Sequence, residues 1–475
     1  MSSPAPARPR PVHRAADLLA AYLPGSFYYS SARGVLLADG VHSHVRGTAG
    51  NRAAAAAEAL EAAVLAGVEN PVVVGAIGFR PDSGSSLIVP AVVRRAEAPG
   101  GSVTVNSTGG RAELAAGISG SAAGDRAADG ECSARRDLGG APGGAVESKE
   151  NPGGPSRTAD SPNPVEPTEN HPAPHSDAAS GDPKASRANR SPWTVVPKPA
   201  PEVYAESVRR AVDLIGDGEL RKVVLARALD LVGEQGVSVR KLLRDLVQAD
   251  PAAHAFAVDV SAPGDPAPRT LVGASPELLV SRKGNVVTAN PLAGSRRRTG
   301  DPARDARAVA ELRVSEKDLD EHALVAAQVA EVLGRYCTEL EVPEAPEVIG
   351  TPTMWHLSTR ITGRVGSGGP SSLELAEALH PTPAVCGVPV GLARDTIARL
   401  ESEDRGYYAG LVGWTDLAGD GEWVVTIRCA EVSGATARLF AGAGIVAGSD
   451  PAAELAETSA KFGTLLRALG AEGVA

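Results

Sequence analysis

Two pairs of acidic residues have a spacing that could hold a metal ion. Asp318 and Glu321 are three residues apart in one helix-like stretch, and Glu454 and Glu457 are three apart in another. Residues at this spacing project from one face of a helix. Two such faces, if they met, would form an all-oxygen site for Mg²⁺, which takes one or two direct carboxylates. By themselves, such pairs are more often solvated surface charges.

A lysine and a glutamate are candidates for proton transfer. Lys222 opens the apolar segment KVVLA, and Glu277 stands in GASPELLV between a Ser-Pro turn and a predicted strand. A lysine acts as a base only if its neutral form is accessible. A glutamic acid donates near neutral pH only if burial or a second carboxylate raises its pKa. The alternative is a solvated strand end and an ordinary turn acid.

Cations and glycines that could hold an anion gather toward the C-terminus. The apolar flanks of Arg428 predict a central strand, where a buried guanidinium pairs with a bidentate anion or a structural carboxylate. FAGAGIV predicts a glycine-rich turn over 442–444 whose amides could hold a carboxylate. Lys461 follows Glu457 by four, the spacing of an ordinary helical ion pair. Residues 296–298, three arginines after PLAGS, are expected to face solvent.

Several function classes are excluded. A formal net charge of -10 argues against a nucleic-acid binder, which would show a basic stripe. The N-terminal segment lacks the apolar run of a signal peptide, and no later stretch reaches the length of a membrane span. Gly442, Gly444 and Gly448 miss the dinucleotide fingerprint by one residue, and no Walker A, HExxH or GxSxG sequence occurs. We expect a soluble cytoplasmic protein with no nucleic-acid or membrane partner.

The cysteines argue against a zinc site or a disulfide framework. Cys132, Cys337, Cys386 and Cys429 are scattered without C-x-x-C spacing, which favours a reducing compartment. Cys386 is expected to be a small packed residue and not a nucleophile.

The elements that must position these residues fall in two folded regions. Residues 1–95 alternate helix-like and strand-like patterns, and such patterns resume over 193–475. Residues 96–192 are rich in Gly, Ser, Ala and Pro and cannot bury enough apolar surface to offset their chain entropy. We expect a disordered insertion there, inside one domain.

Short turns between neighbouring strands, such as LAGDGE and SGA, indicate antiparallel pairing and the α+β class. The predicted helices are Ala53 to Ala66, Val203 to Ile215, Ala306 to Cys337, Ser372 to Leu379, Arg394 to Leu400 and Ala452 to Leu469. The predicted strands are Pro71 to Phe79, Lys222 to Leu231, His254 to Val260, Glu277 to Ser281, Val286 to Ala289, Ser358 to Arg364, Gly410 to Asp416, Glu422 to Val432 and Thr436 to Ala443.

Taken together, the segments resemble the chorismate-utilising enzymes, and most closely the isochorismate synthases of siderophore and menaquinone pathways. The matching stretches are RKVVLAR, GASPELLV, PLAGSRR, SEKDLDEHALV, TPTMWHL, HPTPAVCG, GEWVVTIRCAE, RLFAGAGIV and AETSAKF, in family order. GSFYYSSARGVLLADGV and PVVVGAIGF resemble the family's N-terminal part. The resemblance implies a four-layer α/β/β/α sandwich of two large antiparallel sheets flanked by helices.

The resemblance also implies roles. Lys222 matches the base that activates water, and Glu277 matches the acid that protonates the departing hydroxyl. The other matched positions are Glu321 and Glu457 as direct Mg²⁺ ligands, Asp318 and Glu454 beside metal-bound waters, Gly294 and Ser295 at the ring carboxylate, Arg428, Lys461, Gly442, Ala443 and Gly444 at the enolpyruvyl carboxylate, and His356 and Tyr408 in the pocket wall. A dianionic substrate would then meet a divalent cation and fixed donors.

The implied reaction converts chorismate to isochorismate in a monomeric enzyme. Lys222 argues against the amine-transferring relatives, which lack a lysine there. Salicylate synthases keep Lys222 and Glu277 and then eliminate pyruvate; they remain an alternative, although they tend to carry threonine at about Val385. A non-catalytic protein of the same fold is a second alternative, but no acid, base or metal ligand is lost here. Departures from the family are Cys386, where serine is common, and the 96–192 insertion.

Overall fold

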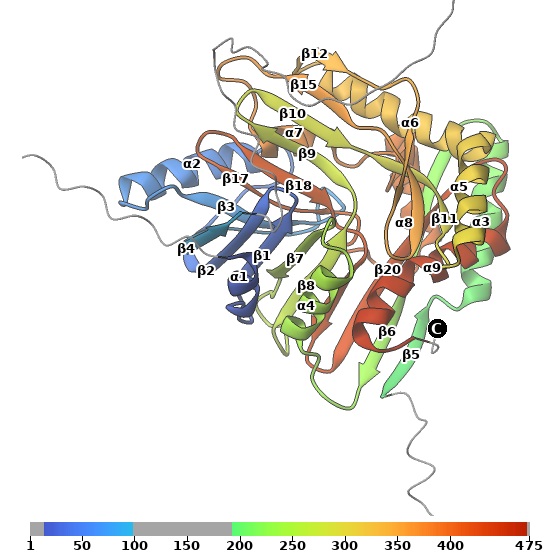
Figure 1. The fold of residues 1–475 in the computed structure, drawn as a ribbon, viewed down its shortest axis with the longest axis horizontal. Helices are drawn as coiled ribbons and strands as arrows, with labels where there is room; N and C mark the ends of the chain where they lie inside the picture. Colours follow the sequence, from blue (N-terminus) through green and yellow to red (C-terminus); the bar gives the residue numbers. More distant parts are fainter. Residues whose placement is uncertain (1–13, 98–191, 473–475) are drawn as a thin grey trace, which may run out of the picture. The chain divides into compact units, whose positions relative to one another are not determined.

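The structure, a computed structural model, describes residues 14–97 and 192–472. The expected insertion falls outside these ranges except at residues 96, 97 and 192, and Cys132 also lies outside them. The described residues form helices and strands of the expected α+β class (Figure 1). None of the helices in these two ranges is long and apolar enough to cross a membrane.

The helices are α1 (Ala15–Ala20), α2 (Arg52–Leu65), α3 (Pro201–Gly216), α4 (Val239–Ala249), α5 (Pro302–Val314), α6 (Glu316–Leu333), α7 (Ser372–Leu379), α8 (Val390–Leu400) and α9 (Pro451–Leu469). The strands are β1 (Phe27–Ser31), β2 (Gly34–His44), β3 (Val72–Ile77), β4 (Ser85–Ala96), β5 (Trp193–Lys198), β6 (Lys222–Gly233), β7 (His254–Asp259), β8 (Arg269–Ser275), β9 (Leu278–Lys283), β10 (Val286–Asn290), β11 (Leu292–Arg297), β12 (Thr338–Glu341), β13 (Glu347–Gly350), β14 (Met354–Ser358), β15 (Ile361–Arg364), β16 (Gly387–Val388), β17 (Leu411–Asp416), β18 (Gly421–Val425), β19 (Cys429–Ser433) and β20 (Thr436–Ile445).

One antiparallel network of 17 strands runs through the described residues. Its strands follow one another as β12-β15-β10-β9-β18-β17-β3-β4-β2-β1-β7-β8-β19-β20-β6, and β5 and β16 both pair with the outer edge of β6. The two expected sheets are therefore joined, and β1 to β4 make the junction. A separate three-stranded sheet, β11-β14-β13, lies beside α5 and α6.

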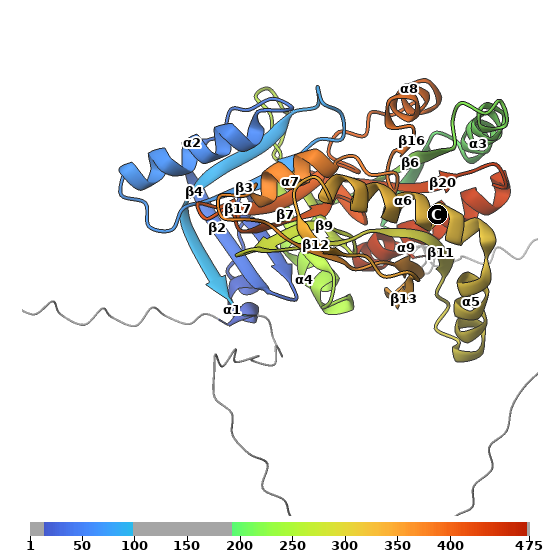
Figure 2. The same ribbon diagram turned by 90° about the horizontal axis from the view of Figure 1, so that it is seen from above.

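Helices cover both sides of the strand network (Figures 1 and 2). α2 and α7 contact each other, and α7 packs on β9, β17 and β18. On the other side, α1 packs on β2 and β4, α4 packs on β7 and β8, and α9 packs on β20. This arrangement explains why the helices are amphipathic, since each buries one apolar stripe against strands.

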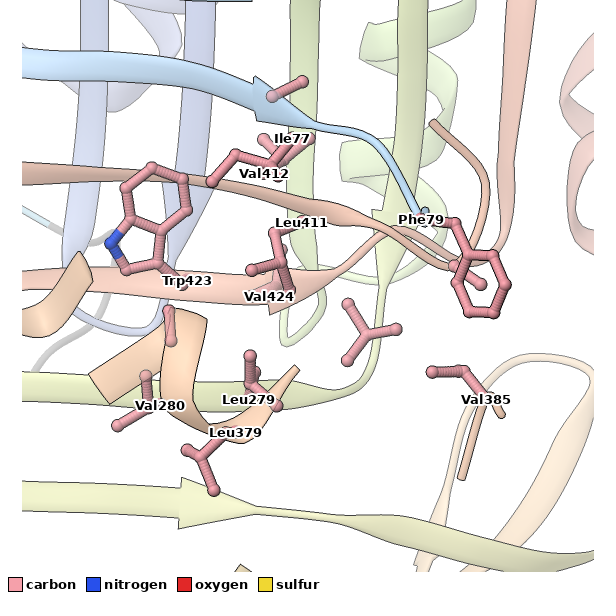
Figure 3. Packing of buried hydrophobic residues seen from close by; sticks show 14 of the residues in the cluster. Ile77, Phe79, Leu279, Val280, Leu379, Val385, Leu411, Val412, Trp423 and Val424 are labelled. Carbon is pink, nitrogen blue, oxygen red and sulfur yellow. The ribbon is translucent and has the colours of Figure 1, made fainter. Parts of the chain in front are cut away.

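The apolar core fixes two strands next to predicted site residues: β9 begins directly after Glu277, and β18 ends shortly before Arg428. Figure 3 shows Trp423 and Val424 of β18 packed between Val412 of β17 and Leu279 and Val280 of β9, and all five are at most 3% exposed. Burying each such side chain contributes about 1.5–3 kcal/mol. β9 and β18 are therefore held rigidly at the ends that carry Glu277 and Arg428.

Four predicted elements differ from the structure. The predicted strand Ser358 to Arg364 is interrupted at residues 359–360, between β14 and β15. The predicted helix Ala306 to Cys337 is two helices, because Ser315 has an extended backbone (φ -74°, ψ 106°) and its hydroxyl accepts a hydrogen bond from the amide of Asp318, 3.3 Å away. The predicted strand Glu422 to Val432 breaks after Val425 into β18 and β19. The predicted glycine turn at 442–444 is part of β20.

Candidate active site

A cavity forms where β6, β11, β20, α6 and α9 come together, and most of the predicted site residues line it. Its walls are Val224, Pro276, Glu277, Leu292, Ala293, Gly294, Ser295, Glu321, His356, Ala384, Val385, Tyr408, Ala409, Ile427, Arg428, Gly442, Gly444, Glu457 and Lys461. Lys222 lies directly behind Glu321, and Asp318 lies behind Gly294. Ala443 is fully buried in the core, because its side chain alternates to the opposite face of β20 from its two glycine neighbours.

The glycines of β20 make room for the acidic and aromatic groups of the cavity. A Cβ on Gly444 would stand 2.2 Å from Oε1 of Glu321, and one on Gly442 would stand 3.0 Å from the hydroxyl of Tyr408. The turn predicted here is wrong because β20 stays paired with β6 as far as Ile445. The missing side chains of Gly442 and Gly444 therefore let Tyr408 and Glu321 lie close to the backbone of β20.

The amides of these glycines nevertheless face away from β6. Gly442 and Gly444 stand opposite Ala226 and Val224 in the ladder. The backbone amides of Ala226 and Val224 bond to groups on the other edge of β6, so these are the non-hydrogen-bonded pairs of the antiparallel ladder. The carbonyl oxygen of Gly442 accepts a hydrogen bond from Nζ of Lys461, 2.9 Å away. This bond is consistent with the carbonyl also facing away from β6. Two glycine amides are thus directed toward the cavity side.

Glu277 is a buried acid. It is 3% exposed, and burial raises the pKa of its carboxyl from 4.5 to about 7. The amide of Leu292 and the cations Lys222, Arg428 and Lys461 act in the opposite direction, but their effect on this pKa is smaller. The alternative of a solvated turn acid is therefore excluded, and the carboxyl can hold a proton near neutral pH.

Lys222 is a fully buried lysine at the start of β6. Its side chain is 0% exposed, and Nζ lies 3.0 Å from Oε1 of Glu321. β16 covers this end of β6, where Val388 stands opposite Lys222. The alternative of a solvated strand end is therefore excluded as well.

Arg428 lies in the break between β18 and β19, so the prediction of a central strand position is wrong. Its backbone is left-handed, with φ at 51°, which costs a residue with a Cβ about 1 kcal/mol or more. Arg428 is 8% exposed, and among the described residues its Nε has no hydrogen-bond partner. A buried, uncompensated guanidinium facing a cavity is suited to bind an anion.

His356 stands next to this guanidinium and is neutral. Nη2 of Arg428 lies 3.3 Å from Nε2 of His356. Burial, and then the charges of Arg428 and Lys461, hold the pKa of the imidazole well below its usual range. The neutral ring can therefore accept the hydrogen bond. Tyr408, stacked on Phe440 with ring centres 5.1 Å apart, closes another part of the wall.

Each predicted metal carboxylate is paired with a cation. The pairs are Glu321 with Lys222 at 3.0 Å, Asp318 with Arg296 at 2.5 Å, Glu454 with Lys317 at 2.6 Å and Glu457 with Lys461 at 2.6 Å. Asp318 and Glu454 are 3% and 1% exposed, so they are not solvated surface charges. With these pairings, no three His, Cys, Asp or Glu side chains within 14–97 and 192–472 lie close enough together to hold a metal ion.

The donor set nevertheless fits a hard divalent cation. Burial acts to raise the pKa of Glu457, but Lys461, Lys317 and the hydroxyl of Ser295 outweigh it and keep this carboxylate ionised. Three carboxylates, those of Glu454, Glu321 and Glu457, act to raise the pKa of the Lys317 ammonium. Positive charge is therefore favoured at this position. All the nearby donors are oxygens, as Mg²⁺ requires.

Arg405 and Glu401 are structural residues of the site that the sequence pattern did not reveal. Arg405 donates to both carboxylate oxygens of Glu401, at 2.5 and 2.9 Å, and to the carbonyls of Val385 and Val224, both at 2.8 Å. Glu401 also accepts from the amide of Ala226 at 2.8 Å. The pair fills the gap along β6 between β16 and β5, and it holds two walls of the cavity. In the sequence it resembles any exposed i, i+4 ion pair.

The prediction for Arg296 was wrong, and Lys317 was missed. Arg296 was expected to face solvent, but its guanidinium pairs with Asp318 and donates to the carbonyl of Ser295 at 2.9 Å. Lys317 drew no prediction, since one lysine in a charged first turn of a helix carries no signal. Cys386, by contrast, is confirmed as packed: it is 0% exposed, and burial raises the pKa of its thiol to about 11.

Comparison with known proteins agrees with the geometry. Residues 169–470 match the family described as "Chorismate binding enzyme". The isochorismate synthase DhbC of Bacillus subtilis is 53% identical over 283 residues, 59% of this chain and 71% of that protein. A putative isochorismate synthase MenF of Mycobacterium tuberculosis is 50% identical over 279 residues, 58% of this chain and 75% of that protein. The crystal structure of a putative 2,3-dihydroxybenzoate-specific isochorismate synthase, DhbC from Bacillus anthracis, superimposes with a TM-score of 0.75 at 38% identity, over 96% of this chain and 100% of that chain.

Replacing Glu277 with glutamine is expected to stabilise the protein above pH 8 and to change little at pH 5. The folded-state pKa of about 7 exceeds the ordinary 4.5, so the stability that the protonated carboxyl contributes is lost as pH rises through this window. Above pH 8 ionising the buried group costs up to about 3 kcal/mol, which glutamine avoids. Urea denaturation at both pH values measures this, with exposed Glu61→Gln as control. Equal free energies of unfolding at the higher pH would contradict it.

Replacing Arg405 with methionine is expected to cost about 3–5 kcal/mol, because it leaves the carboxylate of Glu401 buried and unpaired. The double variant with Glu401→Met should be less destabilised than the sum of the two single variants. Arg307→Met, which breaks an exposed i, i+4 pair with Glu311 at 2.7 Å, is the matched control and should cost under about 1 kcal/mol. Urea denaturation measures the free energy of unfolding of each variant. A double variant that loses as much as the two single variants together would argue against a buried pair.

Proposed function

The chain belongs to the family of chorismate-binding enzymes, and from this we propose that it is an isochorismate synthase. It converts chorismate to isochorismate by adding water at ring carbon 2 and releasing the hydroxyl at carbon 4. The observation that carries the proposal is Glu277, a buried acid with a pKa of about 7 in the same cavity as the unpaired guanidinium of Arg428. The identity with isochorismate synthases over the catalytic region supports it.

The two proton-transfer groups would act at different carbons: Lys222 where water adds, and Glu277 where the hydroxyl leaves. Lys222, once its amine is neutral, takes a proton from water as the water oxygen bonds to carbon 2. Both ring double bonds shift, from C1=C2 to C1=C6 and from C5=C6 to C4=C5, and the hydroxyl at carbon 4 leaves as water with the proton of Glu277. Because one water enters and one leaves, substrate and product have the same composition. The reaction is an isomerisation.

The carboxylates of the substrate would be held at two places. Arg428, Lys461 and the amides of Gly442 and Gly444 receive the enolpyruvyl carboxylate, and an uncompensated guanidinium supports this assignment. The ring carboxylate lies beside Gly294 and Ser295. Ala443 would contribute backbone alone, since its side chain is in the core.

We propose Mg²⁺ as the cofactor, held by Glu321 and Glu457, with Asp318 and Glu454 beside its waters. When bound, it would neutralise the ring carboxylate and polarise the ring toward attack at carbon 2. We also propose a cytoplasmic monomer whose product enters siderophore, salicylate or menaquinone biosynthesis. The names of the relatives support the siderophore and menaquinone pathways.

Purified protein with chorismate and Mg²⁺ is expected to form isochorismate without pyruvate. Chromatography of the products and a lactate dehydrogenase assay for pyruvate measure this. Val385 lines the cavity where salicylate synthases tend to carry threonine, so pyruvate loss is the outcome to test. Stoichiometric salicylate and pyruvate, with no lyase added, would show a salicylate synthase; no turnover would show a non-catalytic protein.

Lys222→Ala and Glu277→Gln are each expected to lower kcat by about 10²–10⁴-fold, the range of a lost proton-transfer group. In the wild type kcat should fall as pH rises past about 7, because Glu277 then loses the proton that it must donate. Rates from pH 5.5 to 9 and circular dichroism separate chemistry from folding, with Glu61→Gln as control. Near-normal turnover in either variant would refute the assigned role.

A further inference from the structure

A wide surface groove leads along α6 to the acidic part of the cavity. Its walls include Lys317, Glu321 and Leu324 of α6, and across from them residues 388–390 and 446–448. Glu321 lines both the groove and the active-site cavity, so the two hollows border each other at this residue. Lys317, in the first turn of α6, lines the groove with its side chain 34% exposed.

The ammonium of Lys317 links the two helices that carry the predicted metal carboxylates. Nζ is 2.6 Å from Oε1 of Glu454, on α9, whose side chain is 2% exposed. Glu321 stands one turn after Lys317 on α6, and Glu457 stands one turn after Glu454 on α9. Lys317 therefore joins α6 to α9 and places a positive charge next to the acids of both helices.

Lys317 differs from the three other cations that pair with these acids. Lys222 is fully buried. Lys461 and Arg296 each also donate to a backbone carbonyl, at 2.9 Å. In the described residues Lys317 has a carboxylate as its hydrogen-bond partner, and its side chain reaches the groove. It is the cation that can leave the acids without losing a backbone contact or unfolding the site.

We propose that Lys317 is the resident counter-ion of the carboxylate cluster and that it lowers the affinity of this cluster for divalent cations. This inference rests on the proposed function in that the cluster is taken as the metal site. A unit charge and a divalent cation about 5 Å apart repel enough, even in bulk water, to change an affinity by about tenfold. Lys317 thereby stabilises the metal-free protein and keeps the bound cation exchangeable.

Lys317→Gln tests the inference, since glutamine removes the charge and keeps a polar side chain. Without chorismate, Mn²⁺ titrated into the variant should bind at least about tenfold more tightly than to the wild type, measured by the paramagnetic resonance of free Mn²⁺. In EDTA the variant should melt at a lower temperature than the wild type. Lys317→Arg, which keeps the charge, should restore wild-type behaviour in both measurements.

Lys241→Gln is the matched control, because it removes an exposed lysine whose Nζ lies 2.7 Å from Asp245 on α4. It should leave Mn²⁺ affinity unchanged. Equal or weaker Mn²⁺ binding by Lys317→Gln, or no binding by the wild type, would overturn the inference. The product assay stands apart: a wild type that forms no isochorismate would sink the proposed function, while the Mn²⁺ titrations would still decide the role of Lys317.

Discussion

Charge compensation of the acids on α6 and α9 is the interaction on which the site depends. Carboxylates of Asp318, Glu321, Glu454 and Glu457 are brought under the edge of the strand network, and each is matched by one cation. Leaving any of them buried and unpaired would cost several kcal/mol. The helix break at Ser315 begins α6 just before these residues, and its acids Asp318 and Glu321 pair with Arg296 of β11 and Lys222 of β6. The site is therefore electrically close to neutral and open to exchange of partners.

The site also depends on β6 being covered along both of its edges. β20 covers one edge of β6, whereas the other edge is shared by β16, β5 and the pair of Arg405 with Glu401. A guanidinium can satisfy carbonyls from separate segments because its donors form a rigid fork. The side chain of Arg405 thus holds Val224 and Val385, two residues of the cavity wall, in a fixed relation to each other.

Burial, more than residue type, determines which groups of the cavity are charged. Glu277 has a pKa near 7 because it is dehydrated and lacks a close cation, whereas Glu457, on the same cavity, stays ionised beside Lys461. His356 is neutral next to the charged Arg428. One cavity therefore contains an acid that can hold a proton near neutral pH, an ionised acid and a buried guanidinium.

The sequence by itself determined the family, the α+β class and most of the helices and strands, because ordered motifs and periodic patterns are local properties of the chain. It also named residues that the fold brings to one cavity, although their roles stay predictions. Only the tertiary structure decided the rest. The left-handed break at Arg428, the strand position of Gly442 and Gly444, and the burial of Lys222 depend on which strands pair. Ion-pair partners such as Lys317 and Glu454 are 137 residues apart, and no local pattern encodes a contact of that range.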